Sequence, residues 1–160
     1  MELSRRQRSY LLLIVVAALV IIVDRVTKIY VERHFGVGYG PRQIVDHVLF
    51  LSVTRNSGAA FGLFQSFTLG FLIVSIIVMV GILIYYDRLP RREFAARLGF
   101  ALIFGGAAAN AYDRGIKGSV IDFIQVPHWP IFNVADSAIT VGVVLLVLGA
   151  LFQRPSRHRY

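Results

Sequence analysis

The chain has 160 residues, of which 56% are hydrophobic and 16% charged, with a formal net charge of +8 and no cysteine. Soluble domains average about 45–50% apolar and about 25% charged residues, so this composition excludes a soluble core of this size and equally a disordered chain. The lack of cysteine excludes a disulfide scaffold, a thiolate metal site and a cysteine nucleophile. The composition indicates a small membrane protein.

Four apolar stretches can cross a bilayer, which takes about 20 mainly apolar residues for a hydrocarbon core of about 30 Å. The expected spans are residues 10–31, 67–87, 97–112 and 134–152. The first also fits a secretory signal peptide, because arginines at positions 5, 6 and 8 precede it. Since Asp24 and Arg25 follow the apolar run where small residues would mark a cleavage site, we interpret it as a retained helix. The prediction is an all-α membrane protein, with residues 1–160 forming a single membrane domain.

Basic residues set the expected orientation. They concentrate before the first span, between the second and third, and after the fourth. The positive-inside rule then places both termini in the cytoplasm. Because topology accounts for the positive charge, no nucleic-acid partner is expected.

Two connections remain on the outer side. Residues 32–66 form an expected β-rich extracytoplasmic loop, with short strands at 43–45 and 48–54 around a turn at 46–47. The second connection begins at Asp113, and glycines at 115 and 118 with prolines at 127 and 130 are expected to break any helix there.

The positions of the acidic residues are the most informative pattern. Of nine, four fall near the outer ends of spans or in the loop between spans three and four: Asp24, Asp113, Asp122 and Asp136. Carboxylates at membrane depth are costly and usually face a protein interior or a water-filled cavity. Their shared location predicts a site at the outer face.

Two of these acids have a basic neighbour in the sequence. Asp24 and Lys28 are four residues apart on one helix face, which favours a structural ion pair. Asp113 follows Asn110 and directly precedes Arg114, whose guanidinium could anchor a loop end or bind a carbonyl or lipid oxygen of a ligand. The sequence leaves both roles of Arg114 open.

The other two acids have no basic residue within four positions. Asp136 follows Asn133 by three residues, the spacing of a capping arrangement at a helix start, and Asp122 lies in the apolar stretch 120–123. Two carboxylates brought together at an apolar lip share a proton, so that one can act as base on a water while the other donates to the carbonyl under attack. Chance acids at helix ends remain an equal alternative at this point.

Other chemistries have less support. The four histidines lie outside the spans, which argues against a haem between helices, and no zinc, phosphate-loop or serine-elbow motif is present. Gly105 and Ala109 suit close helix packing. We therefore expect no metal and no cofactor.

Five ordered blocks of residues carry a resemblance to a known family. They are Asp24 with Lys28, the stretch from Asn56 through Gly58 to Phe61, the stretch from Gly105 through Asn110 to Arg114, residues 120–123, and residues 132–137. In this order, and across nearly the whole chain, they resemble the motifs of lipoprotein signal peptidases (signal peptidase II), which are bacterial membrane aspartic proteases with four helices.

The resemblance implies an aspartic endopeptidase that cleaves diacylglyceryl-modified prolipoproteins just before the lipid-bearing cysteine. It implies catalytic roles for Asp122 and Asp136, and substrate-binding or site-ordering roles for Asn56, Asn110, Arg114 and Asn133. Supporting roles fall to Asp24, Lys28, Asp113 and Gly58. The outer loop would be a small β-rich cradle on the membrane surface, with a mobile cover of the site after Phe61. The expected location is the bacterial inner membrane, with membrane lipid as a partner and a monomeric chain.

Two alternatives come from other classes. A small proton-coupled transporter could use the same four acids as a relay, but it would need acids in mid-membrane and toward both faces. A purely structural membrane partner leaves unexplained why three asparagines join the acids at one lip.

Overall fold

The computed structural model describes residues 5–58, 67–90 and 92–152. The elements in chain order are α1 (Arg5–His34), β1 (Arg42–Val45), β2 (Leu49–Asn56), α2 (Thr68–Tyr86), α3 (Phe94–Lys117), β3 (Val120–Gln125) and α4 (Val134–Phe152). The expected cover after Phe61 lies outside the described residues, as do the basic residues at 91, 154, 157 and 159.

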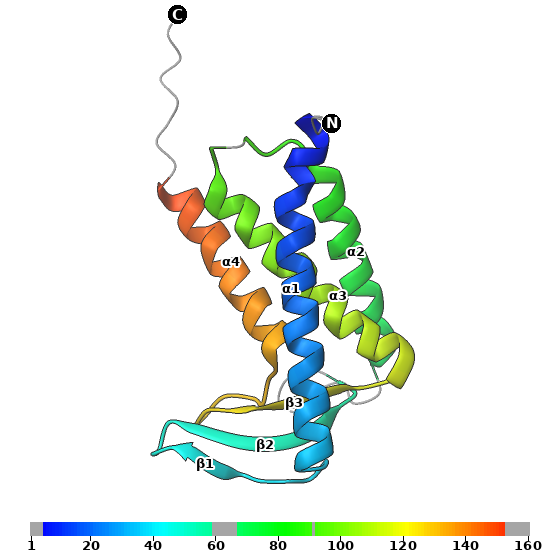
Figure 1. Cartoon of the computed structure of the whole chain (residues 1–160), viewed down its shortest axis with the longest axis vertical. Coiled ribbons are helices and arrows are strands. Elements are labelled where there is room, and N and C mark those ends of the chain that lie inside the picture. Colours follow the sequence, from blue (N-terminus) through cyan, green and yellow to red (C-terminus); the bar gives the residue numbers. More distant parts are fainter. Residues whose placement is uncertain (1–4, 59–66, 91, 153–160) are drawn as a thin grey trace, which may run out of the picture.

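The helices form a bundle with a small sheet across one of its ends (Figure 1). All four are long and apolar enough to cross a membrane. The start of α1 and the end of α4 lie at the end away from the sheet, and we call the other end the sheet end (Figure 1). The predicted fold class, a four-helix membrane protein with a small β-rich lobe, is confirmed.

Helix α3 is the centre of the bundle and contacts each of the other three helices. Helices α1 and α4 approach it closely because glycines occupy the contact positions of α3. A Cβ added to Gly105 would lie 2.9 Å from the Cα of Ala17 in α1, and one added to Gly99 would lie 2.7 Å from the carbonyl oxygen of Gly142 in α4. The small residues of α3 lower its mean hydropathy below that of the other helices. The same residues let neighbouring helices pack closely against it, so that it can be the central helix.

Two helices extend beyond their expected ends toward the sheet. Helix α1 continues to His34, and α3 continues to Lys117, so Asp113 and Arg114 are helical rather than part of a loop. The expectation that Gly115 breaks the helix was wrong, because a single glycine costs a helix only about 1 kcal/mol. Gly118 ends α3 instead, with a left-handed φ of 69° that glycine adopts without steric cost.

The sheet is antiparallel in the order β1-β2-β3. Its first two strands lie where short strands were predicted, and β3 contains the apolar stretch around Asp122. The register pairs Thr54 with Asp122 and Asn56 with Val120. Apolar side chains of the sheet pack with the end of α1 in one cluster, whose buried members are Val31, Val53, Ile121 and Phe123. This packing fixes β3 beneath the helices and so places Asp122 at the sheet end.

The close contact between α3 and α4 yields a stability prediction for Gly106. A Cβ at this position would clash with the backbone carbonyl oxygen of Ala135 and lie 2.8 Å from a side-chain carbon of Ile139. We expect Gly106→Ala to lower the free energy of unfolding by about 2 kcal/mol, the usual cost of overpacking. Gly149→Ala is the matched control, because nothing lies within 4 Å of a Cβ there. Thermal unfolding in detergent measures both, and equal midpoints would contradict the proposed close packing.

Candidate active site

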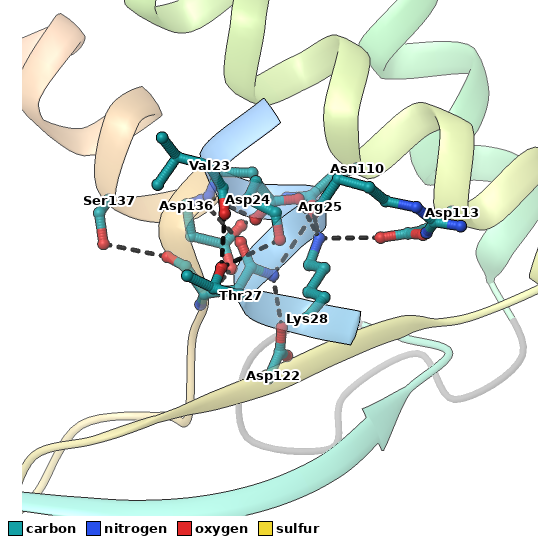
Figure 2. A network of polar contacts seen from close by, with 12 residues as sticks. Val23, Asp24, Arg25, Thr27, Lys28, Asn110, Asp113, Asp122, Asp136 and Ser137 are labelled. Atoms are coloured by element: carbon teal, nitrogen blue, oxygen red, sulfur yellow. Dashed lines mark hydrogen bonds and ion pairs between the residues drawn. The ribbon is translucent and has the colours of Figure 1, made fainter. Parts of the chain in front are cut away.

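Buried polar side chains gather at the sheet end, where α1, α3, α4 and β3 meet (Figure 2). Six of them are at most 3% exposed: Asp24, Lys28, Asn110, Asp113, Asp122 and Asn133. Burying so many charged and amide groups is unfavourable unless each finds a partner. Every one of them does.

The Lys28 ammonium is the hub of the cluster. Its Nζ atom lies 2.7 Å from Asp24 Oδ2 and 2.8 Å from Asp113 Oδ2, and it donates to Asn110 Oδ1 at 3.0 Å. The three contacts use the three hydrogens of the ammonium. The predicted pair of Asp24 and Lys28 is present, but it is part of a larger network in which Arg25 also binds Asp113, at 2.9 Å.

The second oxygen of Asp24 connects α1 to the first turn of α4. Asp24 Oδ1 accepts a hydrogen bond of 2.9 Å from the backbone N–H of Ala135. Ala135 directly precedes Asp136, so this bond holds the backbone next to the Asp136 carboxylate. An amide at a helix start has no partner within its own helix, and Asp24 supplies one.

Asn133 and Asp136 cap the start of α4 reciprocally. The backbone N–H of Asp136 donates to Asn133 Oδ1 at 3.0 Å, and the backbone N–H of Asn133 donates to Asp136 Oδ2 at 3.2 Å. The predicted capping arrangement is confirmed. It also fixes the direction of the Asp136 carboxylate, whose other oxygen accepts from Asn110 Nδ2 at 2.8 Å.

Two asparagines hold the Asp122 carboxylate. Asn133 Nδ2 donates to Asp122 Oδ1 at 2.6 Å, and Asn56 Nδ2 donates to Asp122 Oδ2 at 2.8 Å. The backbone N–H of Gly58 donates to Asn56 Oδ1 at 3.0 Å, which keeps the Asn56 amide group turned toward Asp122. Asn133 thus contacts both carboxylates, Asp122 through its side chain and Asp136 through its backbone.

Both carboxylates line one cavity of about 450 Å³. Its polar lining is Asn56, Arg114, Asp122 and Asp136, and the rest of the lining is Gly58, Phe71, Val120, Trp129, Pro130, Ile131 and Phe132. The Arg114 guanidinium lies 5.2 Å from the centre of the Phe71 ring, and its buried Nε has no hydrogen-bond partner among the described residues. Asp24, Lys28 and Asp113 are not among the lining residues, so they support the cavity wall from behind.

The environment of Asp122 raises the pKa of its carboxyl to about 6. Burial is the largest cause, because an ionised carboxylate loses its hydration, and the negative charge of Asp136 adds to it. The hydrogen bonds from Asn56 and Asn133 act in the opposite direction. Two carboxyl groups on one cavity, one holding its proton to unusually high pH, are a pattern typical of acid–base chemistry.

The structure brings the ten sequence-predicted site residues to one region, in two layers around the cavity. Three further participants were not predicted: Arg25, Phe71 and Trp129. Arg25 carried a weak signal, because it lies in the turn of α1 that also holds Asp24 and Lys28. Phe71 and Trp129 carried none, because an aromatic residue near a span end is ordinary in membrane proteins.

Comparison with known proteins decides the family. The model of the family described as Signal peptidase (SPase) II matches residues 16–152, most of the chain. The chain belongs to this signal peptidase II family. It is therefore a peptidase, and its four helices make it a multi-pass membrane protein; the transporter alternative is not supported.

Individual relatives agree with the assignment. The lipoprotein signal peptidase of Bacillus velezensis is 38% identical to this chain over 141 residues, and the match covers 86% of this chain and 92% of the relative. That of Desulfitobacterium hafniense (strain DCB-2) is 42% identical over 132 residues, covering 82% and 87%. A solved bacterial membrane enzyme superposes with a TM-score of 0.81 at 30% identity and covers 92% of both chains.

The hub role of Lys28 predicts a large effect of its removal. Lys28→Met leaves the Asp24 and Asp113 carboxylates buried without this cation, and we expect a loss of about 3–5 kcal/mol in the free energy of unfolding. Lys117→Met is the matched control, because Lys117 is 31% exposed in its side chain and lies 3.6 Å from Glu32 and 4.0 Å from Asp113. We expect it to cost less than about 1 kcal/mol. Comparable thermal midpoints for the two variants in detergent would show that Lys28 does not stabilise the cluster more than an exposed lysine does.

The raised pKa of Asp122 predicts a pH-dependent stability. The folded state holds the proton up to about pH 6, whereas the ordinary aspartate value is 3.8, so raising the pH through this window should destabilise the folded wild type by at most about 3 kcal/mol. Asp122→Asn lacks this titration. Its stability relative to the wild type should rise between pH 3.8 and about 6 and stay level above that. Unfolding measured across this range tests it, and parallel profiles would show that Asp122 titrates normally.

Proposed function

We propose that this chain is an aspartic endopeptidase in which Asp122 and Asp136 form the catalytic pair. As a member of the lipoprotein signal peptidase family it removes signal peptides from prolipoproteins, and we assign as its substrate the diacylglyceryl-modified form, cut just before the lipid-bearing cysteine. The observation that carries the catalytic assignment is the placement of two carboxylates on one cavity, both held by Asn133.

The pair works with one proton between its two members. Asp122, with its raised pKa, carries that proton and donates to the oxygen of the scissile carbonyl, while ionised Asp136 takes a proton from a water. The water oxygen attacks the carbonyl carbon and forms a tetrahedral intermediate. When the carbon–nitrogen bond breaks, the proton on Asp136 passes to the leaving amine, and Asp122 recovers its own proton as the carboxylic acid product forms.

The neighbouring polar residues have separate roles in this proposal. Arg114 binds a substrate backbone carbonyl, because its guanidinium is held over Phe71 at the cavity with Nε unpartnered among the described residues. Asn56 orients Asp122 and, because it lines the cavity, also binds the substrate chain in this proposal. Asn110 and Asn133 order the pair, and Asp24, Lys28 and Asp113 hold these asparagines and α4 in place.

The location of the site follows from the arrangement of charge along the chain. Ten of the seventeen basic residues precede the first apolar run, lie between the second and third, or follow the fourth in the sequence. The start of α1, the connection of α2 to α3 and the end of α4 lie at the end of the bundle away from the sheet, so the positive-inside rule assigns the sheet end to the extracytoplasmic side of the bacterial inner membrane. There the acyl chains of the substrate stay in the bilayer while water reaches the scissile peptide. The site draws on one chain, and we assign a monomer as the active form.

Replacing either carboxylate tests this function. We expect Asp122→Asn and Asp136→Asn each to lower the cleavage rate by about 10³-fold or more, because each removes one half of a proton-sharing pair. The assay follows the gel shift of a diacylglyceryl-modified prolipoprotein and of its unlipidated form, with purified protein in detergent.

Asp46→Asn is the matched control, since Asp46 is an exposed acid in the β1–β2 turn and lies outside the cavity lining. It should cleave at the wild-type rate, and thermal unfolding should show all three variants folded. Activity retained in either pair variant would overturn the assignment.

A further inference from the structure

The segment between β3 and α4 forms a closed loop beside the cavity. Its two ends are joined by backbone hydrogen bonds, from Phe132 N–H to Ile124 O at 2.9 Å and from Ile124 N–H to Phe132 O at 2.8 Å. In Figure 1 the segment leaves β3 and turns back to the start of α4. Because Asp122 precedes this loop and Asp136 follows it, the loop is held in a fixed position relative to both carboxylates.

A tight turn at the tip of the loop presents Trp129. The N–H of Trp129 donates to Val126 O at 3.2 Å, with Pro127 and His128 between them. His128 has a φ of 61°, a left-handed conformation that is uncommon for a residue other than glycine. A strained residue of this kind persists only where the surrounding structure fixes it, and such residues concentrate at ligand sites. The turn therefore gives the Trp129 side chain a defined place.

Trp129 combines cavity lining with unusual exposure. It lines the cavity that holds Asp122 and Asp136, yet 63% of its surface is exposed, and its indole N–H makes no hydrogen bond within the described part of the chain. The indole N–H of a buried tryptophan usually has a hydrogen-bond partner, while the ring supplies apolar contact area. The side chain is thus placed to be covered by a ligand that has both apolar and hydrogen-bond-accepting parts.

The substrate class of the proposed function has a group of this kind next to the scissile bond. With the scissile carbonyl at the two carboxylates, the next residue carries a thioether-linked glyceryl group with two acyl esters. Its ester carbonyls accept hydrogen bonds and its chains are apolar. Trp129, Pro130 and Ile131 follow one another along the cavity wall and provide the matching apolar surface with one donor.

We infer that Trp129 is a specificity-determining residue that binds the glyceryl ester region of the lipid group on the substrate. The inference rests on the proposed function, because it takes the diacylglyceryl-modified chain as the ligand. The indole ring covers the start of the acyl chains, and the indole N–H donates to an ester carbonyl. Selection of lipidated over unlipidated substrate then depends on this side chain, while the chemical step depends on Asp122 and Asp136.

Kinetics of three variants test the role. Trp129→Ala should raise KM for the diacylglyceryl-modified substrate about tenfold, from lost aromatic contact area, and leave kcat within about twofold. Trp129→Phe, which keeps an aromatic ring but lacks the N–H donor, should have a KM between those of the wild type and Trp129→Ala. Tyr30→Ala is the control, since Tyr30 is 55% exposed near the sheet end of α1 and does not line the cavity. An unchanged KM in Trp129→Ala would overturn the inference.

Fluorescence measures the contact directly, because Trp129 is the only tryptophan in the sequence. A tryptophan-free lipopeptide with bromine on the acyl carbons near the ester is titrated into the Asp122→Asn variant in detergent. We expect strong quenching, weaker quenching with bromine at the chain ends, and no spectral change with the unlipidated peptide. Equal quenching by a brominated phospholipid alone would mean that Trp129 is only an interfacial anchor and would overturn the inference.

The two proposals fail in different ways. If the wild type does not cleave the diacylglyceryl-modified substrate, the proposed function fails. If Asp122→Asn cleaves the lipopeptide during the titration, as a gel of the sample would reveal, the catalytic pair is wrong. If cleavage behaves as expected but neither KM nor quenching responds to Trp129, only the specificity role fails.

Discussion

The contacts of the buried Lys28 ammonium with three surrounding oxygens are the interaction on which the rest of the site depends. A cation inside a membrane protein is costly, and this one is stabilised by oxygens of Asp24, Asp113 and Asn110, with all three distances at or below 3.0 Å. The carboxylates need the cation as much as it needs them. Because one member comes from α1 and two from α3, the network joins these helices at one depth, and Asp24 extends it to the backbone of α4.

Two asparagine side chains connect the buried network around Lys28 to the carboxyl groups at the cavity. An asparagine amide can accept on one side and donate on the other, so Asn110 receives a hydrogen bond from Lys28 and gives one to Asp136. Asn133 does the same between the start of α4 and Asp122. The two carboxyl groups at the cavity are thus connected to the charged hub through neutral groups. In the proposed reaction, fixed donors of this kind need no rearrangement, which is how an apolar site stabilises developing charge.

Much of this arrangement could be predicted from the sequence, since the apolar runs indicated the four helices and the positions of four acids indicated where the buried polar cluster lies. Capping at Asn133 and the pair of Asp24 and Lys28 are local patterns, and both are present. The closest partners of Asp113, Arg25 and Lys28, could not be predicted, because they come from a helix more than 80 residues away in the chain. For the same reason the role of Arg114 stayed open, as its surroundings depend on Phe71 in α2.

The contact surfaces of α3 and the outward faces of the other helices differ in how freely their residues can be substituted. The glycine contacts of α3 with α1 and α4 leave no room for a single added carbon. The outward faces of α1, α2 and α4 expose large apolar side chains, such as Leu19, Ile77 and Val144, as expected of helices that cross a membrane. Any apolar residue serves there, because acyl chains make no specific demand on side-chain shape. Sequence divergence can therefore accumulate on the lipid-facing surface while the backbone stays the same, in keeping with a TM-score of 0.81 at 30% identity.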